Sequence, residues 1–194
     1  MKNRYKKSEE FLKRAEITVP LGSQTFSKSK TQLPIGISPF FASKAKGAYM
    51  WDVDGNKYID FVNGLASITI GYNNRTITKA VKSQLKKGTI FSLSHELEFK
   101  VAEKICEMVP CAEQVRFGKN GSDATSGAIR LARAYTKKDV VLVCGYHGWQ
   151  DWYIGSTTRD EGVPKATKEL THKFAYNDIE SLKKKIKELS GNIA

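Results

Sequence analysis

A run of five apolar residues, VVLVC at positions 140–144, constrains the fold of this chain more than any other feature. An uninterrupted apolar strand is typical of a parallel sheet that is covered on both faces. A helical pattern over residues 122–136 precedes the run, and a short strand is expected before that helix, at residues 114–117. Strand, helix and strand within about 30 residues form a βαβ unit with parallel strands. The sequence therefore predicts an α/β fold.

Local patterns predict the remaining elements. Asp54 and Gly55 form a turn signal between two strand-like segments, so a hairpin is expected over residues 47–61. Residues 18–45 contain three prolines without periodicity and are expected to be irregular. Four further helices are expected, at residues 4–16, 74–87, 95–108 and 179–189.

A metal site is not expected. Asp52, Asp54 and Asn56 resemble the opening of an EF-hand loop, which needs glycine at its sixth position and glutamate at its twelfth. Those positions hold Lys57 and Asn63, so calcium binding by this loop is rejected. The three histidines are far apart and lack the spacing of metal ligands.

The charge of the chain raises the alternative of nucleic-acid binding. Lys and Arg number 32 against 20 Asp and Glu, which gives a net charge of +12. The basic residues are spread along the chain, and no zinc-finger, RNP or Arg-rich motif is present, so we interpret the charge as a solvated surface. No apolar run approaches the ~18 residues of a membrane helix, and no signal peptide is recognised. Three cysteines without a CxxC pair favour reduced thiols in the cytoplasm.

The first candidate site is the segment GKNGSDA at residues 118–124, which joins the expected strand to the helix. Free N–H groups and the positive end of the helix dipole favour an anion there, such as a phosphate. Gly121 lets the backbone approach a ligand, and Ser122 offers a hydroxyl. Neither GxGxxG nor a Walker A loop is present. The structural alternative is a tight turn with Ser122 as the N-cap.

The second candidate site is GYHGW at residues 145–149, directly after the apolar run. Ligands of open α/β sheets bind at the carboxyl ends of the strands. Tyr146 could stack on a planar ring, and His147 could form a hydrogen bond or move a proton; a purely structural role for both is the alternative. Together the two segments suit a flat aromatic cofactor with a phosphate arm. No GxSxG motif supports a catalytic triad.

Several motifs follow one another in a fixed order: WDVDGNKYIDF at 51–61, IGYN at 70–73, NGSDA at 120–124, AIRLAR at 128–133 and YHG at 146–148. In this order they resemble class III pyridoxal-phosphate (PLP) aminotransferases, in particular the branch of glutamate-1-semialdehyde aminomutase. The resemblance runs from about residue 20 to the C-terminus. It implies a fold type I PLP-dependent transferase, with residues 1–70 as a small-domain segment and 71–194 as part of a large domain with a mostly parallel sheet.

The resemblance also implies roles for single residues. Gly121 and Ser122 would bind the phosphate of PLP, Tyr146 would stack on its ring, and Asn120 and His147 would support them. Family members are dimers with active sites at the subunit interface, so a homodimer is expected.

Two positions depart from the aminomutase pattern. Gln24 stands where the arginine for the substrate carboxylate is expected, and Leu65 stands where a tryptophan is expected. A neutral glutamine cannot form a charge-assisted fork to a carboxylate. We therefore expect Gln24 to face a different carbonyl acceptor, for example a sugar of a surface polysaccharide, which would receive its amino group from an amine donor.

The length is the largest departure, because members of the family are about twice as long. The lysine that forms the Schiff base and the acid that pairs with the pyridine nitrogen belong to the second half in the family, and PLP chemistry needs both. No catalytic residue is therefore assigned, and the 194-residue chain alone is expected to be inactive. The alternative is an assembly module that pairs with a separate C-terminal half.

Overall fold

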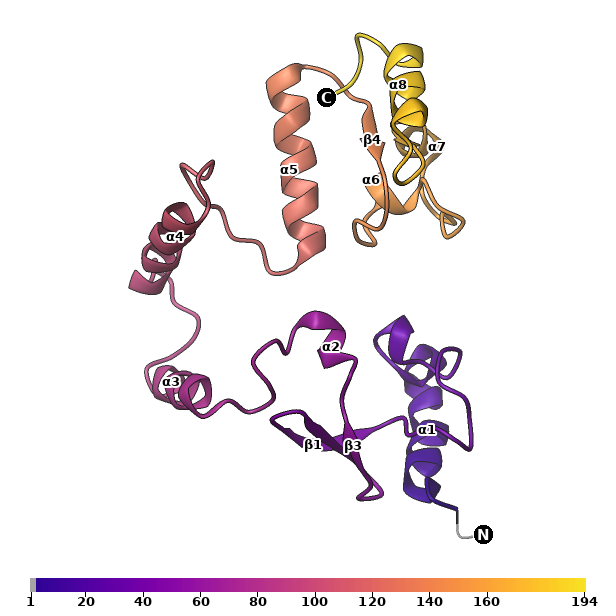
Figure 1. Cartoon of the computed structure of the whole chain (residues 1–194), viewed down its shortest axis with the longest axis vertical. Coiled ribbons are helices and arrows are strands. Elements are labelled where there is room, and N and C mark those ends of the chain that lie inside the picture. Colours follow the sequence, from indigo (N-terminus) through magenta and orange to yellow (C-terminus); the bar gives the residue numbers. More distant parts are fainter. Residues whose placement is uncertain (1–2) are drawn as a thin grey trace. The chain divides into compact units, whose positions relative to one another are not determined.

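The structure is a computed structural model that describes residues 3–194, shown in Figure 1. The chain divides into two compact units, with the boundary between Leu93 and Ser94. Each unit is described by itself below. The division of the family fold after residue 70 stays a prediction.

The first unit contains a three-stranded antiparallel sheet of β1 (Ala42–Lys46), β2 (Tyr49–Asp52) and β3 (Lys57–Ile59). The expected hairpin is confirmed by the antiparallel pairing of β2 with β3. Its turn contains Gly55 at a φ of 89°, a conformation that favours glycine. Strand β1 lies partly inside the segment expected to be irregular, and that expectation is wrong there. Most of its residues are exposed, so it lacks the apolar alternation by which a strand is recognised.

Helix α1 (Lys6–Thr18) confirms the helix expected near the N-terminus and is joined to the hairpin turn. The carboxylate of Asp54 accepts hydrogen bonds from the N–H groups of Lys7 (2.8 Å) and Ser8 (2.9 Å) in the first helical turn. Ser8 is fully buried, and its hydroxyl accepts the N–H of Phe40 at 2.7 Å. The turn therefore caps a helix that lies more than forty residues away in the sequence.

The other helical segments of the first unit are short, apart from α3 (Arg75–Leu85), which confirms the helix expected at 74–87. Asn74 caps α3, because its side-chain oxygen accepts the N–H groups of Thr76 and Ile77. The short segments are η1 (Pro20–Gly22), η2 (Phe26–Lys28) and α2 (Asn63–Ala66).

The second unit contains a small parallel sheet around the apolar run. Strand β4 (Val141–Val143) pairs in parallel with β5 (Thr171–Lys173), and on its other side Val140 forms a parallel bridge with Ile193. Val140, Val141 and Val143 are buried. A strand with neighbours on both sides and a buried apolar surface is what the sequence predicted, and the α/β class is confirmed.

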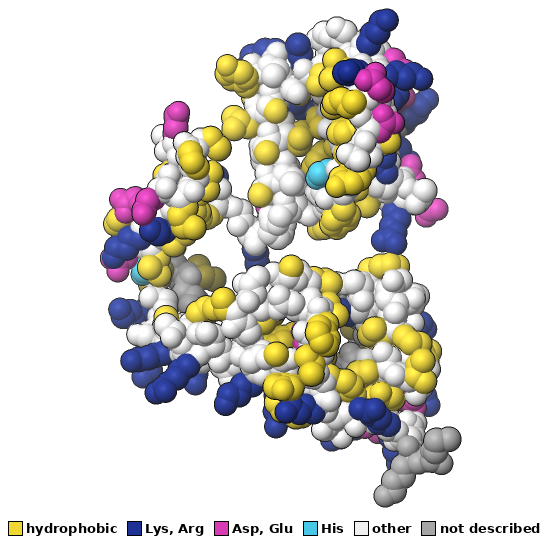
Figure 2. Space-filling view, in the orientation of Figure 1, with side chains coloured by type: hydrophobic (Ala, Val, Ile, Leu, Met, Phe, Trp, Pro, Cys, Tyr) yellow, Lys and Arg dark blue, Asp and Glu magenta, His cyan; other side chains and the backbone are white. Residues whose placement is uncertain are grey.

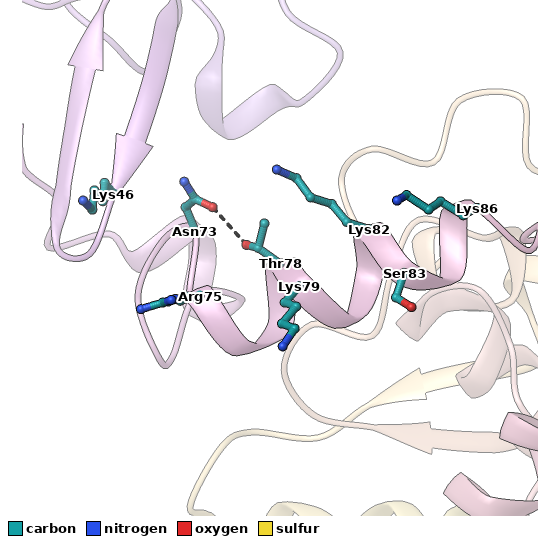
Figure 3. A pocket seen from close by; sticks show the side chains of 8 residues that line it. All are labelled: Lys46, Asn73, Arg75, Thr78, Lys79, Lys82, Ser83 and Lys86. Atoms are coloured by element: carbon teal, nitrogen blue, oxygen red, sulfur yellow. Dashed lines mark hydrogen bonds between the residues drawn. The ribbon is translucent and has the colours of Figure 1, made fainter.

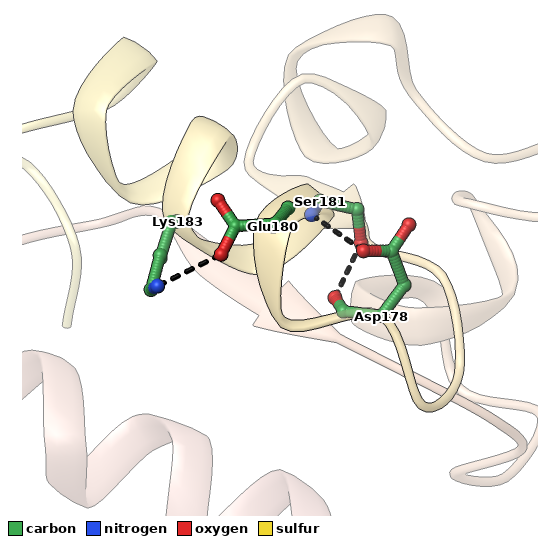
Figure 4. Close-up of polar contacts among 4 residues, drawn as sticks. All are labelled: Asp178, Glu180, Ser181 and Lys183. Atoms are coloured by element: carbon green, nitrogen blue, oxygen red, sulfur yellow. Dashed lines mark hydrogen bonds and ion pairs between the residues drawn. The ribbon is translucent and has the colours of Figure 1, made fainter.

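The helices of the second unit are α4 (Glu96–Met108), α5 (Gly121–Thr136), α6 (Asp151–Ile154), α7 (Lys165–Lys168) and α8 (Ile179–Glu188). The three longest confirm the expected helices at 95–108, 122–136 and 179–189. Helix α8 begins at Asp178, whose Oδ1 accepts the N–H of Ser181 at 3.0 Å, and Lys183 pairs with Glu180 at 2.8 Å (Figure 4). This N-cap is of the kind that serine, threonine, asparagine and aspartate provide.

The prediction of a strand at residues 114–117 is wrong. These residues belong to no strand, and the neighbours of β4 among residues 3–194 are β5 and the segment around Ile193. A strand exists only when a second strand accepts and donates its backbone hydrogen bonds. The parallel crossover in this unit is instead β4, α6, α7 and β5.

Helix α5 packs on the sheet through Ile129, which contacts the core of Val141, Val143 and Tyr153. Neither α5 nor α4 contains a fully buried residue. On α4 the apolar residues Leu97, Val101 and Met108, which recur at helical spacing, are exposed. Figure 2 shows hydrophobic side chains on the surface over this helix. No described helix is both long and apolar enough to cross a membrane.

Candidate functional site

The first turn of α5 presents a backbone site for an anion. Asn120 is the N-cap, because its Oδ1 accepts the N–H of Asp123 at 3.0 Å, so the N-cap is not Ser122 as the structural alternative expected. The N–H groups of Gly121 and Ser122 have no acceptor within the helix, as in the first turn of any helix. A Cβ at Gly121 would have no atom within 4 Å, so open space lies beside the Cα of Gly121.

The loop that follows β4 lies directly against this helix end. Gly148 is buried, has a φ of 111°, and leaves no room for a side chain. A Cβ there would overlap the Ser122 hydroxyl and lie 3.0 Å from Ser122 Cβ. The two candidate segments, 118–124 and 145–149, therefore meet at the contact between Gly148 and Ser122.

Polar side chains hold the loop and the helix together. Thr125 Oγ1 donates to the carbonyl oxygen of His147 at 3.2 Å, and Gln150 Nε2 donates to Asp123 Oδ1 at 3.3 Å. Ser126 Oγ bonds Gln150 Oε1, and Trp152 Nε1 donates to Ser126 Oγ at 3.0 Å. The sequence reasoning missed these residues. The signal was available, since Thr125 and Ser126 follow Ser122 at the spacing of one helix face.

The ring of Tyr146 is largely exposed. The residue is 76% exposed, and its ring forms a T-shaped contact with Tyr153, with centroids 5.8 Å apart and an interplanar angle of 86°. Tyr153 is buried, and its hydroxyl donates to the carbonyl oxygen of Gly145 at 2.6 Å. A fixed neighbour thus contacts an exposed ring, which suits stacking on a planar group.

His147 is part of the loop's internal structure. Its Nε2 lies 2.7 Å from the carbonyl oxygen of Cys144, which can only accept, so Nε2 carries the proton. The ring stacks with Trp152 at 28° and 6.4 Å and meets Tyr153 edge-on at 5.3 Å. With Nε2 engaged, only Nδ1 is left for a ligand. His147 therefore positions the loop beside Tyr146.

Gln24 belongs to the other unit, where it is exposed between η1 and η2. Leu65 lies in the same unit and lines an apolar cavity of about 390 Å³ together with Asp60 and Tyr72. Tyr72 donates its hydroxyl to Asp60 Oδ2 at 2.6 Å. This hydrogen bond, with those from the N–H groups of Val62 and Asn63, lowers the pKa of Asp60 despite burial. An ionised carboxylate thus stands at the wall of an apolar cavity.

Within residues 3–194, no three His, Cys, Asp or Glu side chains gather in a way that could hold a metal ion. The donors of the α5 site are backbone N–H groups and a hydroxyl, which bind anions.

Known proteins are similar to this chain in both sequence and fold. A 3-aminobutyryl-CoA aminotransferase of Cloacimonas acidaminovorans is 40% identical over 178 residues, which are 91% of this chain and 42% of that protein. A glutamate-1-semialdehyde 2,1-aminomutase of Chlorobium chlorochromatii is 37% identical over 97% of this chain and 46% of its own length. The FumI protein of Sphingopyxis sp. MTA144, solved in its PLP internal aldimine form, superimposes with a TM-score of 0.88 at 32% identity. That match covers 96% of this chain and 44% of the FumI chain.

The chain thus spans about half the length of the relatives it matches. The profile of the family described as "Aminotransferase class-III" matches residues 33–191. The family and the fold expected from the resemblance are confirmed, and this chain belongs to the class III aminotransferase family.

Proposed function

We propose that this chain supplies the phosphate-binding and ring-stacking part of a PLP-dependent aminotransferase or aminomutase. The observation that carries the proposal is the contact of Ser122 with Gly148, which places the donors of α5 beside the loop of Tyr146. The residues present fit PLP, because open space lies before Gly121 and a tyrosine ring is exposed nearby. When bound, PLP supplies an electron sink for moving an amino group.

The chain's own residues bind and orient. The N–H groups of Gly121 and Ser122, the Ser122 hydroxyl and the helix dipole would hold the phosphate, each dipole contact contributing about 0.3–1 kcal/mol. The Oδ1 of Asn120 accepts the N–H of Asp123, so this cap leaves the N–H groups of Gly121 and Ser122 available for the phosphate. Tyr146 would cover one face of the ring and exclude water from it, while His147 holds the loop in place.

The acceptor is a carbonyl compound whose recognition does not depend on a positive charge at position 24. The side-chain amide of Gln24 has two N–H donors and one carbonyl acceptor. These groups match a substrate with a hydroxyl or amide group better than one with a carboxylate, which a charged donor binds more strongly. A sugar of a surface polysaccharide is one such acceptor.

The 194 residues by themselves would not complete a catalytic cycle. They correspond to 42–46% of the length of the relatives. The resemblance assigns the Schiff-base lysine and the acid for the pyridine nitrogen to the second half of the family pattern. The complete enzyme would act as a homodimer in the cytoplasm.

The test is a titration of the chain with PLP, followed by absorbance and by tryptophan fluorescence. Saturable binding that weakens in Ser122→Ala and in Tyr146→Ala is the expected result. Tyr135→Ala is the matched control, because Tyr135 is another exposed tyrosine, at 88% exposure, on the far end of α5. Equal binding by all variants would contradict the proposed site. A borohydride-trapped adduct at one specific lysine, together with transamination, would contradict the expected inactivity.

A second candidate is an assembly module that pairs with a separately encoded C-terminal half. The specific observation is α4, whose apolar residues remain uncovered within the described chain. A search of the adjacent reading frame for a lysine-bearing second half distinguishes the two candidates. Co-expression of both halves would then give transaminase activity that the chain alone lacks.

A further inference from the structure

The first unit contains a basic groove that the proposed function does not use. Four cations follow one face of α3 at intervals of four, three and four residues, and a fifth comes from the end of β1 (Figure 3). They surround a pocket of about 730 Å³, which contains no acidic side chain. The cations are Lys46, Arg75, Lys79, Lys82 and Lys86.

These cations have no ion-pair partner among residues 3–194, whereas eight lysines elsewhere in that range do. Helix α8 is the comparison, since it contains four lysines in ten residues. There Lys183 meets Glu180 at 2.8 Å (Figure 4). Lys185 meets Glu188, also at 2.8 Å. Three of the four lysines of α8 meet a glutamate of their own helix, whereas the cations of α3 meet none within residues 3–194. Figure 2 shows Lys and Arg gathered over α3, with no Asp or Glu among them on this face.

This arrangement works against the stability of the helix. Like charges four residues apart repel each other across one helical turn. Arg75 stands in the first turn, at the positive end of the helix dipole, where an acidic residue would be favoured. The free protein gains nothing from the cluster, and a bound anion would turn the repulsion into attraction.

We propose that the groove of Lys46 and α3 binds a multiply phosphorylated small molecule, the class that includes nucleotides and coenzyme A. Several ammonium groups match several phosphates, because lysine binds phosphate as a point charge. Uncharged donors complete the lining. Thr78 donates to Asn73 Oδ1 at 2.9 Å, which leaves the Asn73 amide N–H groups for a ligand, and Ser83 adds a hydroxyl.

The shape favours a small molecule over a polymer. The pocket volume falls in the range of about 300–1,000 Å³ that is usual for small-molecule sites. No aromatic side chain lines it, so single-stranded nucleic acid would find no ring on which to stack its bases. This inference is independent of the proposed function, since it concerns other residues in the other unit.

The experiment is isothermal titration of the 194-residue chain with inorganic tripolyphosphate at low salt, repeated with coenzyme A. We expect saturable binding near one ligand per chain that weakens about tenfold or more in Lys79→Glu/Lys82→Glu. The matched control is Lys183→Glu/Lys184→Glu, which changes the net charge equally but leaves the groove intact. Binding in the control is expected to stay within about threefold of the original chain, since distant charges are screened.

Three results would overturn the proposal. Equal weakening by both double variants would show that only the net charge attracts the anion. If Ser122→Ala lost tripolyphosphate binding and Lys79→Glu/Lys82→Glu kept it, the anion would bind at α5 instead of at the groove. If the protein were retained on heparin but gave no heat of binding with tripolyphosphate, the groove would be a surface for polyanionic polymers. If coenzyme A bound more tightly than tripolyphosphate, the groove would also recognise the organic part of the ligand. Equal affinities would show that the groove recognises the phosphate chain alone.

Discussion

At the scale of single residues, Gly148 joins the two halves of the candidate site. An alanine there would overlap Ser122 and hold a positive φ. We expect Gly148→Ala to lower the free energy of unfolding by about 1–3 kcal/mol and to weaken PLP binding. Gly162→Ala is the control, since Gly162 has a φ of 82° but open space around it, so it carries backbone strain without the overlap. Urea unfolding and PLP titration of both variants give the measurement. Equal effects would show that the contact with Ser122 is unimportant.

A second residue-scale prediction concerns pH. The hydrogen bond from Tyr72 is the largest cause of the lowered pKa of Asp60. A carboxyl group with a lowered pKa stabilises the fold above its unfolded pKa of ~3.9 and loses that contribution as the pH falls through its folded value. Tyr72→Phe is expected to raise the pKa of Asp60 and to shift acid unfolding to higher pH. Carboxyl NMR titration checks this, with Tyr176→Phe, an exposed tyrosine at 88%, as the control.

At the scale of elements, α1 depends on a cap from the hairpin turn. Asp54→Ala would leave the N–H groups of Lys7 and Ser8 without their acceptor, so we expect a loss of about 0.5–2 kcal/mol in the free energy of unfolding. Asp54→Asn keeps one side-chain oxygen and should lose less. Asp139→Ala, a change of an exposed aspartate in the other unit, is the control. Equal stability of Asp54→Ala and the original chain would mean that water replaces the cap.

Elements differ in how far the sequence predicts them. Helices α3, α4, α5 and α8 were predicted because their periodicity and caps are local. Strands β1 and β5 are short and partly polar, so only their partners define them, and residues 114–117 have the composition of a strand without a neighbour. The residues of the candidate site also differ in how far the sequence predicts them. Gly121, Ser122 and Tyr146 follow from motifs, whereas the bonds of Thr125, Gln150 and Trp152 arise only in the folded unit.

At the scale of the whole molecule, the uncovered apolar faces govern behaviour in solution. On α3 the residues Ile77, Val81 and Leu85 are 50–60% exposed, and on α4 Leu97 and Val101 are nearly half exposed. Contiguous apolar surface of this kind marks an interaction site or an aggregation hazard. The chain also spans about half the length of its relatives. We therefore expect the 194-residue protein to self-associate as its concentration rises.

Sedimentation velocity over a range of concentrations measures this association. Leu97→Glu/Val101→Glu should shift the protein toward the monomer, because charges on the face of α4 oppose its burial. Glu103→Gln/Glu107→Gln is the control, since it changes the polar residues of the same helix and leaves the apolar face intact. A monomer at every concentration would show that these faces are tolerated in water. If the C-terminal half of a relative, added in trans, suppressed self-association and the Leu97→Glu/Val101→Glu variant abolished that effect, the face of α4 would be the surface on which the second half docks.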